Sequence, residues 1–202
     1  MFSLRWIVIL LILSIGLTAC ASATSPAESP AEPSVPEPEP VVEASPASQA
    51  ELLSPDESPP PGAAAQFSTD FSKHSVSYGD ILSGGPPKDG IPAIDAPSYV
   101  SIEDANGWIN DVEPIIAVEV DGVSRAYPLQ ILTWHEIVND VLNEKPLVVS
   151  FCPLCNTAIA FEREFDGQIL DFGTTGRLRY SNLIMYDRQS ETWWQQATGD
   201  GI

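Results

Sequence analysis

The chain has 202 residues and a formal net charge of −19 at pH 7, because 28 acidic residues stand against 9 lysines and arginines. Nucleic-acid-binding proteins present a basic patch to the phosphate backbone, so this balance argues against a nucleic-acid partner. Of the three cysteines, one lies near the N-terminus and the other two form a CxxC pair.

The first residues have the layout of a secretory signal. Arg5 is the single charged side chain before Glu28, and residues 6–17 are almost wholly apolar. This apolar run is shorter than the roughly 18–20 residues that a membrane span needs, but it fits the core of a signal peptide. The sequence Leu-Thr-Ala directly before Cys20 resembles the lipobox of bacterial lipoproteins. We therefore expect a lipoprotein signal peptide over residues 1–19. We also expect a lipid on Cys20 that anchors the protein outside the cytoplasm, to the cell membrane or the outer membrane.

Residues 20–66 differ sharply in composition from the rest of the chain. Between Ala21 and Gln66 there are eleven prolines, eight acidic residues and no lysine or arginine. Such a segment buries too little apolar surface to offset its chain entropy, which predicts a disordered linker. A single globular domain, residues 67–202, is expected to follow. Because the sequence stops at TGDGI, directly after an aromatic strand and a turn, we expect this domain to be incomplete at its C-terminal end.

The first predicted elements of the globular part are a hairpin and a helix. Residues 114–120 (PIIAVEV) and the run VSRAYPL flank Asp121-Gly122, a typical two-residue hairpin turn. Farther on, apolar positions recur at three- and four-residue spacing. This period predicts an amphipathic helix that begins at Gln130 and ends near Asn143. The positions that carry it are Ile131, Leu132, His135, Val138, Val141 and Leu142.

The rest of the globular part consists of short β-prone runs. Residues 147–151 form one, and residues 156–165 alternate between apolar and polar side chains as a half-buried strand does. QILDFG, NLIMYDR and TWWQQ complete the pattern. Many short strands with one main helix predict a β-rich α+β domain of antiparallel hairpins. Because a strand follows Cys155, we do not expect a thioredoxin-like fold, in which the CxxC pair opens a helix.

Five motifs stand together in the globular part: DGIPAID, AYPLQILTWHEIVND, FCPLCNTAIAF, DFGTTG and LIMYDRQSETWWQQATG. With them, the segment from Gly90 to Ile202 resembles a large prokaryotic family, domain of unknown function family 3179, which has CPLCN as its signature. The resemblance implies an exported or membrane-anchored protein, in agreement with the lipobox at Cys20. It also implies a further strand region beyond the tryptophan segment, where this chain stops. It implies no reaction.

Cys152 and Cys155 stand where one predicted strand ends and the next begins. Two thiolates on a tight turn form half of the ligand set of zinc knuckles and ribbons. His135, on the apolar face of the predicted helix, is the candidate third ligand, and the alternative is a core histidine whose ring bonds to backbone groups. Glu136 lies about 100° away around the helix and is a weak fourth ligand. A Cys152/Cys155/His135 site with one open position would suit zinc or copper, and metal binding is our leading hypothesis.

Two alternatives remain for the same pair. A CxxC pair can cycle between dithiol and disulfide, which would make the protein a thiol–disulfide oxidoreductase with Cys152 or Cys155 as the attacking thiolate. Alternatively, a disulfide braces the turn of a surface binding module without a catalytic role, although so small a ring adds little stability. The residues leave open which alternative holds, and therefore whether the protein is an enzyme. They identify the membrane as a partner through the lipid anchor at Cys20 and leave any protein partner unknown.

Overall fold

The computed structural model describes residues 57–202, so the predicted signal peptide, the lipid attachment at Cys20 and most of the predicted linker lie outside the described residues. The elements are the 3₁₀ helix η1 (Tyr78–Asp80), β1 (Ile81–Ser83), α1 (Ile102–Ala105), β2 (Ile115–Val120), β3 (Val123–Pro128), α2 (Leu129–His135), β4 (Ile137–Leu142), β5 (Lys145–Cys152), β6 (Thr157–Glu162), β7 (Glu164–Phe165), β8 (Gln168–Ile169), β9 (Phe172–Arg179), β10 (Asn182–Asp187) and β11 (Trp193–Gln195).

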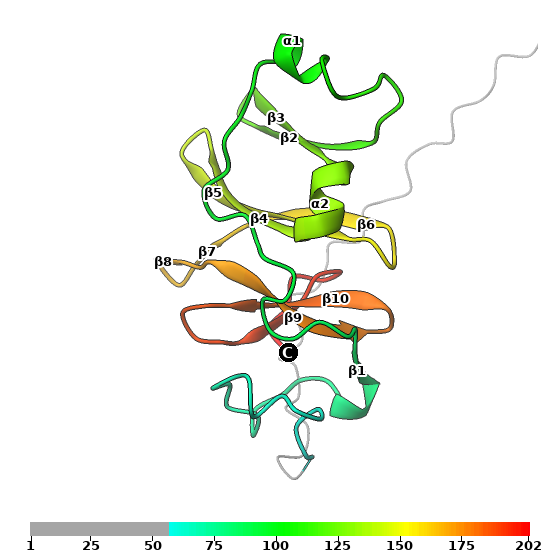
Figure 1. Cartoon of the computed structure of the whole chain (residues 1–202). Helices are drawn as coiled ribbons and strands as arrows, with labels where there is room; N and C mark the ends of the chain where they lie inside the picture. The colour runs from blue at the N-terminus through cyan, green and yellow to red at the C-terminus, as the bar shows by residue number, and fades with distance from the viewer. Residues whose placement is uncertain (1–56) are drawn as a thin grey trace, which may run out of the picture. The chain divides into compact units, whose positions relative to one another are not determined.

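The strands form antiparallel sheets in the orders β1-β9-β10-β11, β4-β5-β6, β2-β3 and β7-β8. Figure 1 shows the first two sheets stacked on each other, with α1, α2 and the β2–β3 hairpin beyond the β4-β5-β6 sheet. The described part of the protein is thus β-rich, with short antiparallel sheets and few helices, as predicted. Among residues 57–202, every helix is too short or too polar to cross a membrane.

Strand β10 lies between two hydrophobic cores, and all of its residues are buried. Its side chains alternate between the two faces of the sheet, as the period of a β-strand requires. Leu183 and Met185 pack against β4 and β5, whereas Ile184 and Tyr186 pack against the segment around Ala63. Ala63 is fully buried, so the packed region begins before residue 67, where the sequence placed its start.

The predicted helix over residues 130–143 is wrong in its second half. Helix α2 ends at His135, and the next residue, Glu136, has a positive φ of 57° that stops the helical backbone. Strand β4 follows and pairs with β5 through the turn Asn143-Glu144, whose φ angles are 49° and 64°. All but one of the β4 residues are buried. Because β4 is buried on both faces, its apolar positions do not show the alternation that marks a half-buried strand.

Two other local predictions are confirmed. Strands β2 and β3 form the expected hairpin, in which Asp121 and Gly122 both take positive φ angles, 48° and 80°. This is the backbone of the type I′ turn, whose twist matches that of the flanking strands. Strand β6 follows the CPLC motif directly, so the motif does not open a helix.

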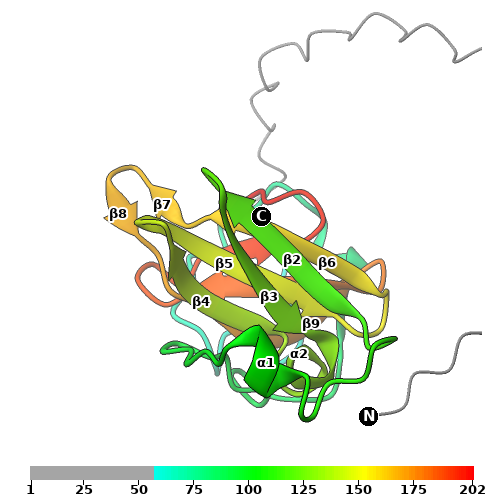
Figure 2. The same cartoon turned by 90° about the horizontal axis from the view of Figure 1, so that it is seen from above.

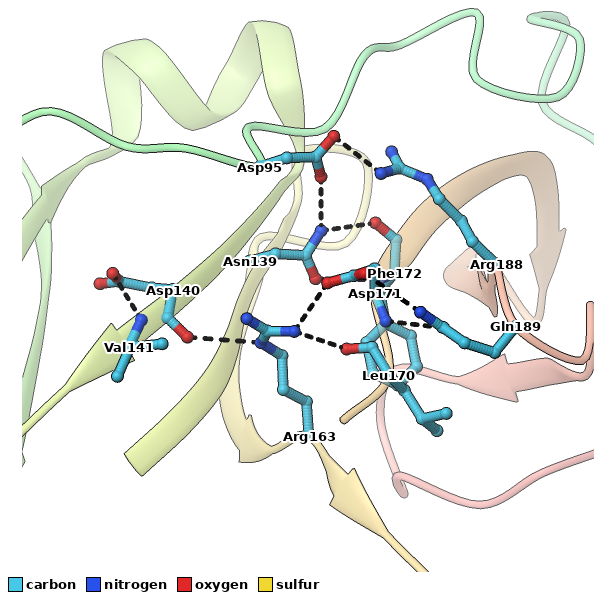
Figure 3. Close-up of polar contacts among 10 residues, drawn as sticks. All are labelled: Asp95, Asn139, Asp140, Val141, Arg163, Leu170, Asp171, Phe172, Arg188 and Gln189. Atoms are coloured by element: carbon cyan, nitrogen blue, oxygen red, sulfur yellow. Dashed lines mark hydrogen bonds and ion pairs between the residues drawn. The ribbon is translucent and has the colours of Figure 1, made fainter. Parts of the chain in front are cut away.

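Polar contacts tie the two stacked sheets together (Figure 3). Asn139 of β4 donates from Nδ2 to the Phe172 carbonyl and to Asp95 Oδ1, both at 2.8 Å, and its Oδ1 accepts from the Phe172 N–H at 2.9 Å. Arg163 donates from Nη1 to the Leu170 carbonyl at 2.9 Å. Asn139 is 1% exposed and Arg163 is 9% exposed. These bonds satisfy backbone groups at the start of β9 that water does not reach.

Candidate functional site

The CPLC motif forms the turn between β5 and β6. Cys152 is the last residue of β5 and pairs with Thr157, the first residue of β6. Asn156 takes a φ of 51°, a left-handed conformation that asparagine adopts more readily than most residues. Cys152 is 1% exposed, whereas Leu154 at the tip of the turn is 70% exposed and Cys155 is half-buried. The two thiols therefore differ in their access to solvent.

Both cysteines are free thiols, and Cys152 contacts the turn between β9 and β10. Cys152 Sγ lies 3.6 Å from the Ser181 carbonyl, and Cys155 Sγ lies 3.9 Å from the Cys152 carbonyl. Ser181 belongs to the β9–β10 turn, which lies with the β5–β6 turn at the right of Figure 1. The motif thus lies where the ends of the two stacked sheets meet.

A network of buried polar side chains extends from Cys155 into the core. Asn182 Nδ2 lies 3.3 Å from Cys155 Sγ and 2.7 Å from Gln196 Oε1. Gln196 donates from Nε2 to Ser150 Oγ at 3.2 Å and to the Thr157 carbonyl at 3.0 Å. Asn182 is 8% exposed, and Gln196 and Ser150 are fully buried. A side-chain amide that is held in place by other hydrogen bonds therefore donates to the sulfur of Cys155.

The pKa values of the two thiols move in opposite directions. Burial, together with the hydrogen bond to Cys155, raises the pKa of Cys152 to about 11. Burial also disfavours ionisation of Cys155, but hydrogen bonds from Cys152, Thr157 and Asn182 outweigh it and lower the pKa of Cys155 below its ordinary value. The thiolate is the nucleophilic form of cysteine, so the more exposed member of the pair is also the more reactive one.

His135 is the last residue of α2 and is half-buried. Its Nδ1 lies 2.9 Å from the Pro92 carbonyl, which is the kind of backbone contact that a structural histidine makes. Within residues 57–202, the structure forms no group of three or more His, Cys, Asp and Glu side chains that could hold a metal ion. It therefore does not bring His135 together with Cys152 and Cys155 as a set of three ligands.

Glu136 lies at the same end of the β4-β5-β6 sheet as the thiols. Its carbonyl accepts a hydrogen bond of 2.7 Å from the N–H of Phe151, the neighbour of Cys152. Burial raises the pKa of the Glu136 carboxyl to about 7. A non-glycine residue with φ 57° and ψ −31° stores backbone strain. Strain and a shifted carboxyl pKa both recur at functional positions.

Glu136→Gln is expected to stabilise the protein at pH 8 by about 1–2 kcal/mol, allowing for solvent screening, and to change stability little at pH 4. The pKa of this carboxyl is about 7 in the folded protein against 4.5 for an ordinary glutamate, so the folded state binds the proton more tightly. Wild-type stability therefore falls as the pH rises from 4.5 through 7. Urea unfolding at both pH values measures the effect. Glu144→Gln, at an exposed position, is the control. An equal effect of Glu136→Gln at pH 4 and pH 8 would contradict the prediction.

Sequence reasoning missed Ser150, Asn182 and Gln196, which form the hydrogen-bond network that begins at Cys155 Sγ. They come from β5, from β10 and from the residue after β11, and only the folded structure brings them together. Gln196 stands in a motif that the sequence analysis quoted, TWWQQATG, but its spacing from the CPLC motif carries no information on contact. Fully buried amide side chains need hydrogen-bond partners, and that requirement is visible only once burial is known.

Comparison with known proteins adds one match. A family model described as "Protein of unknown function (DUF3179)" matches residues 88–202, a range that includes the CPLC turn, Asn182 and Gln196. None of the curated proteins and none of the solved structures matches the chain significantly.

Proposed function

Because the chain belongs to the DUF3179 family, which is described only as proteins of unknown function, we propose from the site alone that Cys152 and Cys155 form a redox-active dithiol. In this proposal the pair exchanges with disulfide bonds of other molecules outside the cytoplasm. A lipid on Cys20 holds the protein at the membrane surface, and the layout of the first residues supports this part. The carrying observation is that two neighbouring free thiols have pKa values shifted in opposite directions.

The proposed reaction assigns a different task to each thiol. The Cys155 thiolate attacks one sulfur of the substrate disulfide, and the second substrate sulfur leaves with the bonding electrons and takes up a proton. Cys152 then loses its proton and attacks Cys155 Sγ, which releases the first substrate sulfur as a thiolate. The substrate is reduced to two thiols while the protein gains a Cys152–Cys155 disulfide, and the reverse sequence oxidises a substrate dithiol.

The surroundings of the pair support this division of tasks. Cys155 is the more exposed thiol, and its lowered pKa increases the share of thiolate at neutral pH. Cys152 is 1% exposed, so a substrate reaches it only through a sulfur already bonded to Cys155. The hydrogen bond from Asn182 takes the place of the helix N-terminus that stabilises a thiolate in thioredoxin-like proteins.

Metal binding through the same pair is the second candidate function. The lack of a three-ligand group among the described residues leaves two thiolates, half of the four ligands that a structural zinc ion takes. Of the two metals considered, copper in its Cu(I) state fits better, because this soft ion is selected by thiolate ligands. This candidate is supported by two neighbouring soft donors, the sulfur atoms of Cys152 and Cys155. His135 is not counted with them, because its Nδ1 contacts the Pro92 carbonyl.

A redox titration with metal analysis separates these functions. The experiment uses the full chain with Cys20→Ser, so that only Cys152 and Cys155 remain. The protein is equilibrated in glutathione buffers of graded redox potential and alkylated, and its mass is then measured by mass spectrometry. We expect a reversible transition in which two alkylated thiols become one disulfide, in a protein that holds no stoichiometric metal after purification. A stoichiometric copper ion that blocks alkylation and is lost in Cys152→Ser would favour metal binding. A pair that stays oxidised at every potential would leave only a disulfide that braces the turn.

Asn182→Ala is expected to raise the pKa of Cys155 and to slow its alkylation at pH 7 about fivefold, because the thiolate loses one hydrogen bond. The rate of reaction with iodoacetamide as a function of pH measures this pKa. Ser150→Ala is the matched control, since it breaks the same network at the Gln196 Nε2 bond without touching sulfur. Equal pH profiles for Asn182→Ala and Ser150→Ala would show that Asn182 acts only on stability.

A further inference from the structure

A cavity of about 460 Å³ lies between α1, the β2–β3 hairpin and α2. Figure 2 views this end of the molecule from above, with α1, β2 and β3 toward the viewer. Tyr127, Leu132 and Val138 form its floor, and none of the three is more than 4% exposed. Tyr99 and Trp108 line its sides and are 44% and 48% exposed. The cavity shares no lining residue with the thiol site.

The mouth of the cavity leaves large apolar side chains in contact with water. Val100 is 60% exposed and Ile102 is 83% exposed, and both line the cavity beside Trp108. An exposed apolar patch of this kind on a soluble domain typically marks a binding site. A hollow of this volume with a mostly apolar lining has the general form of a small-molecule site.

The charges around the cavity disfavour an anionic ligand. Among the described residues that line it, Arg125 alone carries a charge, and its Nη1 forms an ion pair with the carboxylate of Asp140. Burial raises the pKa of Asp140, but hydrogen bonds from Tyr127, Tyr99 and Arg125 outweigh it, so this carboxyl is ionised at neutral pH. The positive charge of Arg125 is therefore already neutralised. Two acidic residues of α1, Glu103 and Asp104, add negative charge near the mouth.

A cationic ligand is disfavoured as well. The guanidinium carbon of Arg125 lies 3.9 Å from the centroid of the Tyr99 ring. It thus occupies one face of Tyr99, which a ligand cation could otherwise contact. The hydroxyl groups of Tyr99 and Tyr127 both donate to Asp140, and no Asp or Glu is among the described residues that line the cavity and could pair with a ligand cation. A neutral molecule remains the best match.

We propose that this cavity is a binding site for an uncharged, largely apolar molecule that carries an aromatic ring. The ring packs against Trp108 and Tyr127, and the apolar body covers Leu132, Val138 and the exposed side chains at the mouth. Aromatic rings favour edge and offset contacts with one another, which gives a ring-bearing ligand an advantage over an aliphatic one of equal size. This proposal is independent of the thiol chemistry.

Two fluorescent probes with the same scaffold test the proposal on the full chain. N-phenyl-1-naphthylamine is uncharged at pH 7, whereas 8-anilinonaphthalene-1-sulfonate adds one sulfonate. We expect saturable binding of the uncharged probe, with enhanced and blue-shifted emission, and at least tenfold weaker binding of the sulfonate. Equal or tighter binding of the sulfonate would overturn the proposal, as would the absence of saturable binding of the uncharged probe.

The variant Ala105→Trp tests whether the uncharged probe binds in this cavity rather than elsewhere on the protein. Ala105 lines the cavity on α1, so a tryptophan side chain there fills space without removing a contact. It is expected to weaken binding of the uncharged probe at least tenfold, while Gln130→Trp, an exposed position on α2 outside the lining, leaves binding unchanged. Equal effects of the two variants would overturn the proposal. So would a dimer in solution that Ala105→Trp dissociates, because a second copy would then cover the patch.

Discussion

Cys155→Ser is expected to slow disulfide exchange at pH 7 by at least about a thousandfold, because the remaining thiol ionises poorly. The pKa of Cys152 is raised to about 11 in the wild-type protein, and the largest cause is burial, which does not depend on Cys155. Cys152 is also 1% exposed, so a substrate disulfide has little access to it. The release of thionitrobenzoate from the aromatic disulfide DTNB, in a Cys20→Ser background, measures the rate.

Cys152→Ser is the matched control, and it changes the stoichiometry rather than the first step. Its Cys155 still attacks, within about threefold of the wild-type rate, since a serine hydroxyl can donate in place of the Cys152 thiol and the hydrogen bonds from Thr157 and Asn182 are kept. The wild-type pair is expected to release two thionitrobenzoate ions per chain as it closes its disulfide. Cys152→Ser should release one and retain the other as a mixed disulfide. Similar rates for Cys155→Ser and wild type would contradict the assignment of the attacking thiol.

Asn139→Ala is expected to lower the free energy of unfolding by roughly 3–4 kcal/mol. The Asn139 amide accepts from the Phe172 N–H at 2.9 Å and donates to the Phe172 carbonyl at 2.8 Å. Its removal leaves both backbone groups buried without a partner and opens a cavity between the two stacked sheets, because Asn139 is 1% exposed. Urea unfolding followed by tryptophan fluorescence measures the loss.

Asn106→Ala is the control for this stability measurement. Asn106 is exposed, follows α1 with a φ of −61° and tolerates alanine without strain, so its substitution is expected to change stability by less than about 0.5 kcal/mol. A loss below about 1 kcal/mol for Asn139→Ala would show that the contact with Phe172 is not a main link between the sheets.

The local features of the fold that follow from short-range chemistry were predictable. The hairpin of β2 and β3 was predicted because Asp121-Gly122 readily adopts the two positive φ angles of its turn. The strand after Cys155 was predicted because its side chains alternate between two environments. In both cases the residues that decide the conformation are neighbours in the sequence.

The error over residues 130–143 arose where the deciding contacts are distant. Apolar residues continue from the end of α2 into β4, which is buried on both faces. In such a continuous stretch, apolar residues three and four positions apart occur by chance. Pairing of β4 with β5 through Asn143-Glu144 overrides that spacing, and Asn-Glu is a weaker turn signal than Asn-Gly. Glu136 separates α2 from β4, but the sequence has no glycine or proline there to signal the end of a helix.

Of the candidate site, the position of the two cysteines was predicted, whereas the residues around them were not. The sequence placed Cys152 and Cys155 on a turn between two strands, and the structure agrees. The grouping of His135 with the cysteines depended on a helix that ends earlier than predicted. Asn182, which contacts Cys155 Sγ, comes from a strand of the other sheet, and a single sequence gives no information on that stacking.

Trapping of the mixed disulfide tests most directly the claim that Cys155 attacks and Cys152 resolves. The Cys20→Ser/Cys152→Ser chain is incubated with glutathione disulfide at pH 7, and the adduct is located by peptide mass spectrometry. In this chain we predict one glutathione on Cys155. In the Cys20→Ser/Cys155→Ser chain we predict no adduct on Cys152 under the same conditions. When both cysteines are present, we predict a Cys152–Cys155 disulfide. An unmodified Cys155, or a glutathione that adds to Cys152 as fast as to Cys155, would contradict the proposed dithiol chemistry.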